Sequence, residues 1–277
     1  MRKLLAFNLI LCLLAGCQSE QASVPEKSPD QEQLNYPIPV AATVGMVADL
    51  VKNVGREYVD VTQIMGSGVD PHMHKASRDD VQTIMNSDMV FYSGLMLEGK
   101  MADTLIKVAR TKPVFAVTEL IDPKSLLEPD DFNGHYDPHV WMDVATWSLC
   151  VDAVKDALSQ YDPRHAEVYQ KNADEYKQQL KTLHEYGLKT IKSIPENSRI
   201  LITSHDAFNY FGRAYGLEVL GVQGISTESE ELFSDAMGEA GSYEGSYMGM
   251  LDHNFTIVAR ALGGTAPEKG MQGKLTP

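Results

Sequence analysis

The chain has 277 residues, of which 43% are hydrophobic, so it can form one large domain or two smaller ones with real cores. Its 38 acidic residues outnumber its 24 basic ones, which gives a formal net charge of −14 at pH 7. Because an acidic surface repels phosphate groups, nucleic-acid binding is excluded from the expected functions, whereas cations are weakly concentrated near such a surface.

Residues 1–16 predict a secretory signal peptide. Arg2 and Lys3 form a basic start, and the apolar run that follows them, 4–14, is too short to span a bilayer. The run ends in Leu14-Ala15-Gly16-Cys17, which resembles a bacterial lipobox. This resemblance implies cleavage before Cys17, a diacylglycerol on its sulfur atom and anchoring to a membrane face. The alternative is a plain cleavage that leaves Cys17 free.

Residues 17–37 are polar, lack apolar periodicity and predict a flexible linker between the lipid and the folded part of the chain. Once Cys12 leaves with the signal peptide and Cys17 carries lipid, Cys150 is the remaining cysteine. No disulfide can then form within the chain. Cys150 stands in an apolar helical pattern, which predicts a small core residue.

Residues 38–143 alternate between strand and helix patterns, which predicts an N-terminal α/β lobe with a parallel sheet. The predicted strands are 38–44, 58–65, 89–92 and 114–117. The predicted helices are 46–55, one that Ser77 caps with Asp80 three residues on, and 101–110. The region 144–194 is predicted to be helical, with helices over 144–161 and 164–192. The second would run ~40 Å at 1.5 Å per residue, enough to join two lobes, and Gly187 could bend it.

Residues 195–277 predict a second, C-terminal α/β lobe. Strands are expected at 199–203 and 218–222, and helices at 207–215 and 247–262. The tail, 263–277, is low in apolar residues and is expected to be frayed. The fold class is therefore α/β, with two lobes of parallel sheet flanked by helices and one long helix between them.

Four short motifs carry residues that bind metals. Two place a histidine directly after proline, Asp70-Pro71-His72 and Asp137-Pro138-His139; a third histidine, His205, follows an apolar strand, and Asp235 lies in a Leu-Phe-Ser-Asp-Ala-Met-Gly segment. Neutral imidazole and carboxylate suit Zn²⁺, Mn²⁺ or Fe²⁺, and three nitrogens with one oxygen can close a tetrahedral site. Each histidine alone would more often be a hydrogen-bonded polar residue; the four motifs together predict one divalent transition-metal site.

These four ordered motifs resemble the metal-ligand motifs of the cluster A-I solute-binding proteins of zinc and manganese ABC transporters, the TroA-like or ZnuA-like lipoprotein family. The resemblance runs from about Val40 to Leu262, and the lipobox agrees with it. It implies two α/β lobes joined by one long helix, with the metal between them on His72, His139, His205 and Asp235.

The same resemblance implies a function and a location. It implies an extracytoplasmic lipoprotein, in the periplasm or on the outer cell surface, that captures a divalent metal as transported substrate and delivers it to an ABC permease. Three imidazoles favour zinc over manganese by the usual affinity order. The loop before the second motif, which is often long and rich in histidine in zinc importers of this family, here offers only His135. The identity of the metal therefore stays open between zinc, manganese and iron.

Other polar residues rank below the four. Asp70 and Asp137 are expected to accept hydrogen bonds from imidazole N–H groups, and Glu98 is a weaker candidate for such a supporting contact. His74 is two residues from His72 and is expected to point away from the metal. The histidines in predicted helices, expected to lie on the surface or to serve packing, are His165, His184 and His253.

The chain departs from the family pattern after Glu230, where it runs directly into the Asp235 segment. Relative to that pattern, roughly one helix–strand unit is missing there, so the C-terminal lobe is expected to be shortened. A natural variant, a damaged gene and an internal deletion are the alternative explanations. An open sheet edge would favour aggregation, and a smaller core would lower the stability of this lobe.

Two alternative functions are weighed against metal capture. A zinc hydrolase is disfavoured because the sequence has no His-Glu-x-x-His motif and four protein ligands leave no open position for water, so the chain is not expected to be an enzyme. A surface adhesin is compatible with an acidic, lipid-anchored domain, although no motif names a partner.

Overall fold

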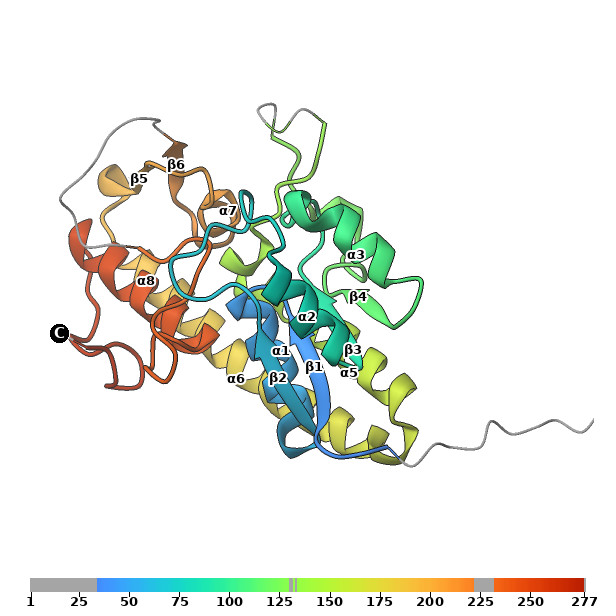
Figure 1. Ribbon diagram of the computed structural model, residues 1–277. Coiled ribbons are helices and arrows are strands. Elements are labelled where there is room, and N and C mark those ends of the chain that lie inside the picture. The colour runs from blue at the N-terminus through green and yellow to red at the C-terminus, as the bar shows by residue number, and fades with distance from the viewer. Residues whose placement is uncertain (1–33, 130–131, 133, 222–231, 277) are drawn as a thin grey trace, which may run out of the picture. The chain divides into compact units, whose positions relative to one another are not determined.

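Figure 1 shows the computed structural model of the protein, which describes residues 34–129, 132, 134–221 and 232–276. Residues 35–277 form one compact unit. The predicted signal peptide, the lipidation of Cys17, most of the linker and the junction after Glu230 lie outside the described residues. None of the helices in the described ranges is long and apolar enough to cross a membrane.

The first sheet has four parallel strands in the order β2-β1-β3-β4. Its strands are β1 (Ile38–Ala42), β2 (Val59–Gln63), β3 (Met89–Tyr92) and β4 (Val114–Ala116). The two central strands, β1 and β3, are almost entirely buried, as expected for parallel strands covered on both faces. This sheet, the helices around it and the segment after β4 up to Asp143 are called the first lobe.

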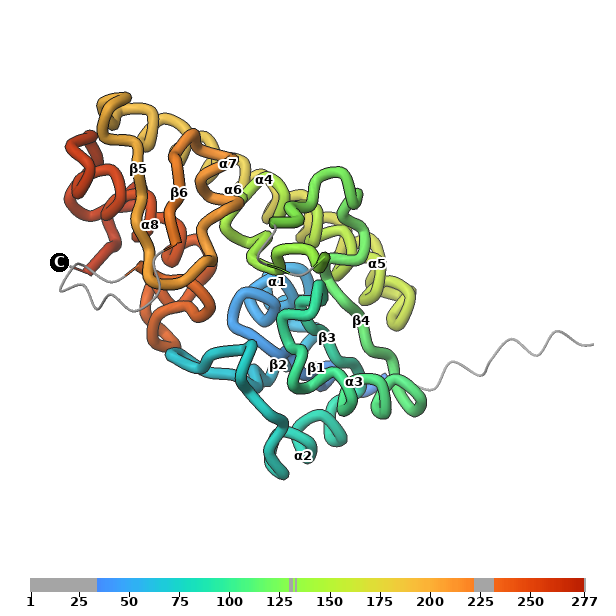
Figure 2. The backbone as a smooth tube through the Cα atoms, turned by 90° about the horizontal axis from the view of Figure 1, so that it is seen from above, coloured from blue at the N-terminus to red at the C-terminus, as the bar shows by residue number. Residues whose placement is uncertain are grey.

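Helices cover both faces of the first sheet, so the parallel α/β prediction is confirmed. Helix α1 (Gly45–Gly55) lies on one face, whereas α2 (Arg78–Asn86) and α3 (Ala102–Val108) lie on the other (Figures 1 and 2). The predicted cap of α2 is also present. Ser77 Oγ accepts a hydrogen bond from Asp80 N at 3.1 Å, and Asp80 Oδ2 accepts one from Ser77 N at 2.8 Å.

The middle of the chain is helical, with one difference from the prediction. In place of a single helix over 144–161, the structure has α4 (Val144–Trp147) and α5 (Cys150–Tyr161). Asp143 caps α4, because its carboxylate accepts a hydrogen bond from Ala145 N at 3.0 Å. Cys150 is fully buried, as predicted.

The long helix α6 (Ala166–Lys192) has 27 residues and joins the two halves of the fold. It contacts α1 and α5 of the first lobe and α7 (Asn209–Tyr215) and α8 (Tyr247–Ala261) further along the chain. It continues through Gly187 without a break. A side chain at Gly187 would meet the ring of Phe255, with a Cβ only 2.4 Å from Cζ, so this glycine allows α8 to approach α6 closely.

The second sheet has two parallel strands within the described residues, β5 (Ile200–Thr203) and β6 (Glu218–Gly221), with α7 between them in sequence. Together with α7 and α8 it is called the second lobe. Leu201 on β5 is buried, whereas Ile200 and Ile202 on the other face are 43% and 62% exposed. One face of this sheet is therefore apolar and open to solvent.

The C-terminal tail differs from the sequence prediction, because its described part is docked and not frayed. Met271 N donates hydrogen bonds to Asp252 Oδ1 and Oδ2 at 2.8 and 3.0 Å, and Thr276 N donates to Glu244 Oε1 at 2.9 Å. Leu275 is buried against the lobe. Two acidic side chains of the α8 region thus hold a tail whose own composition is mostly polar.

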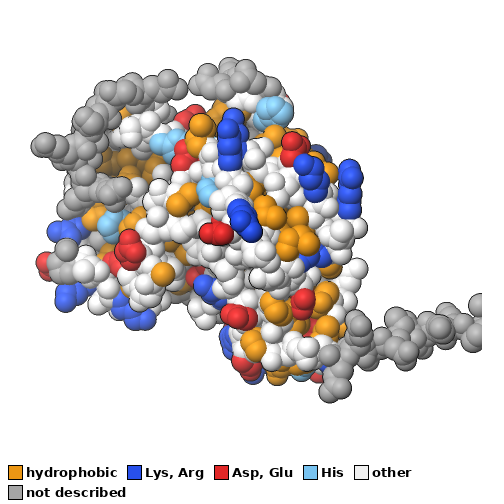
Figure 3. Space-filling model, viewed as in Figure 1, with side chains coloured by type: hydrophobic (Ala, Val, Ile, Leu, Met, Phe, Trp, Pro, Cys, Tyr) orange, Lys and Arg blue, Asp and Glu red, His pale blue; other side chains and the backbone are white. Residues whose placement is uncertain are grey.

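On the face seen in Figure 3, acidic and basic side chains are interspersed with hydrophobic ones. The net charge of −14 is therefore not gathered into a single acidic patch on this face. A more local concentration of negative charge lies at the site described next.

Candidate metal centre

Four segments that are distant in sequence bring His72, His139, His205 and Asp235 together. His72 lies in the loop after β2, and His139 directly precedes a 3₁₀ turn at Val140–Met142; both come from the first lobe. His205 follows β5, and Asp235 lies in the loop that leads to α8, so these two come from the second lobe. One nitrogen or oxygen atom from each of the four residues lies within 4.8 Å of the others, an arrangement that can hold a metal ion.

The separations between these atoms suit a shared metal. His72 Nε2 lies 3.2 Å from His139 Nε2, and His139 Nε2 lies 3.3 Å from Asp235 Oδ1. Two ligands at about 2.0–2.1 Å from zinc, separated by a tetrahedral angle, would lie roughly 3.4 Å apart. These two pairs of atoms therefore need little movement to bind one ion.

Two buried atoms at the centre that could bind a metal lack a hydrogen-bond partner among the described residues. They are His205 Nε2 and Asp235 Oδ1. His205 Nε2 is only 2.7 Å from Asp235 Oδ2, but this close pair does not have hydrogen-bond geometry. Buried polar atoms are normally paired, because leaving one unpaired costs about 1–3 kcal/mol. A cation between these atoms would remove that cost.

Asp137 orients His139, as predicted. Asp137 Oδ1 accepts hydrogen bonds from His139 Nδ1 at 2.7 Å and from the His139 backbone N–H at 2.9 Å, and both residues are buried. Because the contact with Asp137 keeps the proton on Nδ1, Nε2 presents its lone pair to the centre once the ring is neutral. Asp70 acts differently from the prediction: its Oδ1 accepts a hydrogen bond from the backbone N–H of His72 at 2.8 Å, so it shapes the loop.

Charge and burial shift the protonation of these groups. Burial alone would lower the pKa of His139, but its contacts with Asp137 and Asp235 outweigh burial and raise the pKa to about 9. Burial would raise the pKa of Asp235, but its contacts with His139 and His205 hold it well below its usual value. Burial, and next the charge on His139, lower the pKa of His72. The centre therefore keeps a carboxylate ionised next to imidazoles.

Hydrogen bonds between the lobes and within the second lobe hold the loops that carry these residues. Trp141 Nε1 donates to Ser234 O at 2.9 Å, which joins the His139 and Asp235 segments. Asn254, which is fully buried on α8, donates to Phe233 O at 2.8 Å and accepts from Phe233 N at 3.0 Å. The sequence motifs did not identify Asn254 as a residue that supports the site. Its position, as a polar residue on the apolar face of a predicted helix, could have indicated such a contact.

The lower-ranked residues lie elsewhere. His74 Nε2 pairs with Asp80 Oδ2 at 2.9 Å at the start of α2, which agrees with its expected direction away from the centre. Glu98 accepts hydrogen bonds from Thr43 Oγ1 at 2.6 Å and Ser93 N at 2.7 Å, so it supports a loop of the first sheet, and its suggested contact near the metal is wrong. His135 is exposed.

The three helical histidines match the expectation of packing or surface positions. His165 Nδ1 pairs with Asp162 Oδ2 at 2.7 Å, His184 Nδ1 with Tyr215 OH at 3.2 Å, and His253 packs on the ring of Phe233 with centroids 4.8 Å apart. None of the three belongs to the four-residue group.

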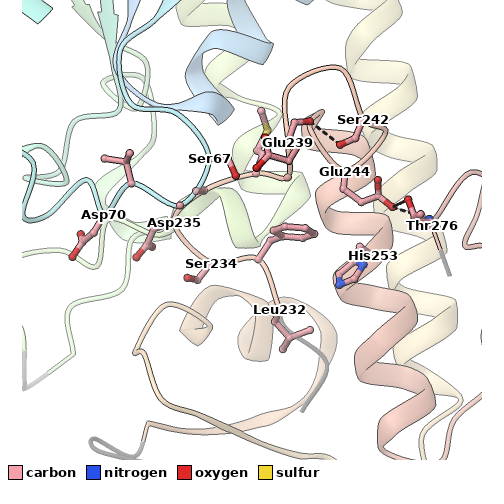
Figure 4. Close-up of a pocket in the computed structure, with 16 residues that line it drawn as sticks. Ser67, Asp70, Leu232, Ser234, Asp235, Glu239, Ser242, Glu244, His253 and Thr276 are labelled. Atoms are coloured by element: carbon pink, nitrogen blue, oxygen red, sulfur yellow. Dashed lines mark hydrogen bonds between the residues drawn. The ribbon is translucent and has the colours of Figure 1, made fainter. Parts of the chain in front are cut away.

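A cavity of about 620 Å³ reaches the centre at Asp235. Figure 4 shows Asp70 and Asp235 on one side of it, with Glu239, Glu244 and His253 on the other side. Acidic residues in a concave site raise the local concentration of cations. The cavity therefore provides a negatively charged approach to the four-residue group.

Comparisons with known proteins agree with this geometry. A family model described as zinc-uptake complex component A, periplasmic, matches residues 40–231. The manganese-binding lipoprotein MntA of Bacillus subtilis is 38% identical, over 90% of this chain and 95% of its own length. The zinc-binding protein TroA of Treponema pallidum is 36% identical, over 80% of this chain and 88% of its own.

A solved structure of the periplasmic zinc-binding protein TroA from Treponema pallidum superposes with a TM-score of 0.76 at 36% identity, covering 81% of this chain and 99% of that one. The alignment with the Bacillus protein runs over 299 residues, more than the 277 of this chain, so it contains positions that this chain lacks. The family model accounts for most of the described first lobe, the long helix and the second sheet. On this evidence the chain belongs to the family of zinc-uptake complex component A, periplasmic.

Proposed function

We propose that the protein captures a divalent transition metal outside the cytoplasm and delivers it to an ABC permease, with His72, His139, His205 and Asp235 as the ligands. One observation carries the proposal: these residues, from two lobes, place one donor atom each within 4.8 Å of the others. The names of the relatives, manganese-binding lipoprotein and zinc-binding protein, support metal as the cargo.

The division of the ligands between the lobes provides a route for release. His72 and His139 come from the first lobe, and His205 and Asp235 come from the second. Any movement that separates the lobes removes half of the ligands at once. A metal held by two ligands binds far more weakly than one held by four, so docking on a permease that opens the lobes would free the ion.

Zn²⁺ and Mn²⁺ are both candidate cargoes. Three imidazoles and one carboxylate bind Zn²⁺ more tightly than Mn²⁺ by the general affinity order of divalent ions. The relatives carry both metals in their names. The supply of each metal therefore decides which ion fills the site in the cell.

The donor set also favours binding over hydrolysis. A catalytic zinc site keeps one position open for water, whereas four protein donors complete a tetrahedral shell. A zinc hydrolase would need one of the four residues to be away from the ion. We therefore assign no enzymatic activity to the protein.

Membrane anchoring through Cys17 completes the proposal. The motif Leu14-Ala15-Gly16-Cys17 and the description of the Bacillus relative as a lipoprotein both support it. In a bacterial expression host, Cys17→Ala should move the protein from the membrane fraction to the soluble extracytoplasmic fraction. Equal membrane retention of both forms would contradict the lipid anchor.

Metal titration tests the central claim. Protein stripped of metal and titrated with Zn²⁺ or Mn²⁺ in a calorimeter should take up one equivalent of ion. Competition between the two ions, followed by metal analysis, should show that the protein binds Zn²⁺ with higher affinity than Mn²⁺. Absence of saturable uptake of either ion by folded protein would refute the proposal.

A further inference from the structure

Helix α7 of the second lobe contacts the first-lobe segment that carries His139. Tyr210 OH donates to Asp137 O at 3.0 Å and accepts from Leu127 N at 2.9 Å. One turn further along, Arg213 Nη1 donates to Ser125 O at 2.7 Å. Figures 1 and 2 both place α7 beside β6, so this contact links the second sheet to the His139 segment.

The first residue of α7, Asn209, contacts the carboxylates adjoining two of the proposed ligands. Its Nδ2 donates to Asp137 Oδ2 at 3.1 Å and to Asp206 Oδ1 at 3.0 Å. Asp137 lies behind His139, and Asp206 directly follows His205. An asparagine amide has two N–H donors, so these two contacts use both of them.

Asp137 needs this contact because it is a fully buried carboxylate. Its Oδ1 already accepts both hydrogen bonds from His139, at 2.7 and 2.9 Å. Asn209 supplies the partner of its other oxygen. Without the amide, Oδ2 would be buried and unpaired, and the carboxylate would gain by rotating away from His139.

We propose that Asn209 is a positioning residue for the bound metal, acting through Asp137 on His139 and through Asp206 on His205. One side chain then sets the spacing of two imidazoles that come from different lobes, whose ring centroids lie 5.2 Å apart. The inference rests on the proposed function, because it takes these histidines as ligands. Asn209 then sets the geometry of the site and does not itself contact the ion.

The choice of amide over carboxylate at position 209 follows from the same contacts. Aspartate has the same shape but no donor, so Asn209→Asp would place three carboxylates together. Both hydrogen bonds would be lost, and like charges would repel each other. The isosteric change should therefore be more damaging than a simple loss of the side chain.

Cobalt binding provides the test, because the visible absorption of bound Co²⁺ reports the geometry of its ligands. Asn209→Ala should weaken Zn²⁺ binding by about 10–100-fold in chelator competition, and should change the Co²⁺ absorption band. Asn209→Asp should do so more strongly. Asn172→Ala is the matched control, because Asn172 is another buried asparagine, whose Nδ2 donates to Val54 O at 2.9 Å away from the site. It should lower stability and leave the spectrum unchanged.

A double-mutant cycle separates positioning from general stability. In an Asp137→Asn background, Asn209→Ala should cause a smaller further loss of affinity than in the wild-type background, because one of the two carboxylates through which it acts is already altered. Fully additive losses would overturn the inference. So would an unchanged affinity and spectrum in Asn209→Ala; if that variant does not fold, the same readings on Asn209→Asp decide. A wild-type protein that binds no metal would instead refute the proposed function.

Discussion

His139 is the most enclosed of the four proposed ligands, with 1% of its side chain exposed. Its backbone and its ring both donate to Asp137, and its other ring nitrogen faces His72 and Asp235. His74, only two residues beyond His72, faces Asp80 at the start of α2 instead. His139 and His74 thus make different contacts: His139 faces the other proposed ligands, whereas His74 faces a helix cap.

Replacing His139 and His74 in turn should distinguish a metal ligand from a histidine that does not bind the metal. His139→Ala should weaken Zn²⁺ binding by well over 100-fold, since changes to supporting residues alone cost about 10–100-fold. His74→Ala removes a helix-cap contact and should leave affinity within a few fold. Chelator competition on both variants measures the difference. Equal losses in the two variants would show that the ligand assignment is wrong.

The pKa of His139, raised to about 9, predicts that metal uptake releases protons. At pH 7 the free site holds His139 protonated between Asp137 and Asp235, whereas metal binding requires the neutral ring. Calorimetry at pH 7 in buffers of different ionisation enthalpy should show release of about one proton per ion. The affinity should rise with pH up to about 9 and then level off. A binding enthalpy independent of the buffer would contradict this.

The raised pKa of His139 makes the stability of the metal-free protein depend on pH in the opposite direction to the metal affinity. A histidine whose folded-state pKa is raised stabilises the fold fully below its unfolded pKa of about 6.5. This contribution is lost as the pH rises through about 9. High pH should therefore favour metal binding and weaken the empty fold, which urea denaturation at pH 6 and pH 9.5 can measure.

At the scale of elements, the contact between α6 and α8 decides how the second lobe is attached. Gly187 on α6 faces Phe255 on α8, and Phe255 also stacks on Phe211 of α7 with ring centroids 5.3 Å apart. Phe255 is fully buried, so its ring has little room to move. Helices α6, α7 and α8 thus meet around the ring of Phe255, which packs against Gly187.

Gly187→Ala should therefore destabilise the protein although alanine favours helices. The added methyl group overlaps the Phe255 ring, and overpacking of this kind costs about 1–3 kcal/mol, against about 1 kcal/mol gained from helix propensity. Urea denaturation of the metal-free protein measures the net effect. Gly99→Ala is the control, because its Cβ would meet only Met96 Cε at 3.9 Å, and it should stay within about 0.5 kcal/mol of wild type. A stabilised Gly187→Ala would contradict the close packing.

At the scale of the whole molecule, the two lobes differ in how well their sheets are covered. The first sheet has four strands with helices on both faces, whereas the described second sheet has two strands and exposes Ile200, Ile202 and Leu220. Helix α8, by contrast, is largely buried against α6. The helix–strand unit expected to be missing after Glu230 would account for the smaller sheet.

Hydrogen exchange on the metal-free protein should reveal this difference. Amides of β5 and β6 should exchange quickly, whereas those of β1 and β3 and of the α8 core stay protected. Metal should slow exchange in the second sheet, since binding stabilises the fold by about 4 kcal/mol at 1,000 times the dissociation constant. Inserting a helix–strand unit after Glu230 should do the same without metal. Equal protection of both sheets in the empty protein would show that the second lobe needs no such completion.

The sequence by itself determined the features that depend on neighbouring residues. Strand and helix patterns located the parallel sheet and α6, and the spacing of Ser77 and Asp80 located a helix cap. The motifs around His72, His139, His205 and Asp235 identified the candidate ligands, because donor chemistry belongs to side-chain type. Cys17 and the signal peptide rest on the same kind of local pattern.

Only the tertiary structure decided the features that depend on residues far apart in the chain. Asn209 meets Asp137 across 72 positions, Asn254 meets Phe233 across 21, and Met271 pairs with Asp252 to dock the tail. The break between α4 and α5 and the backbone role of Asp70 also escaped the local patterns. Such hydrogen bonds follow from how packed elements face each other, which the period of a single segment does not contain. The sequence could therefore name the proposed metal ligands, whereas the contacts that hold them in place depend on the tertiary structure.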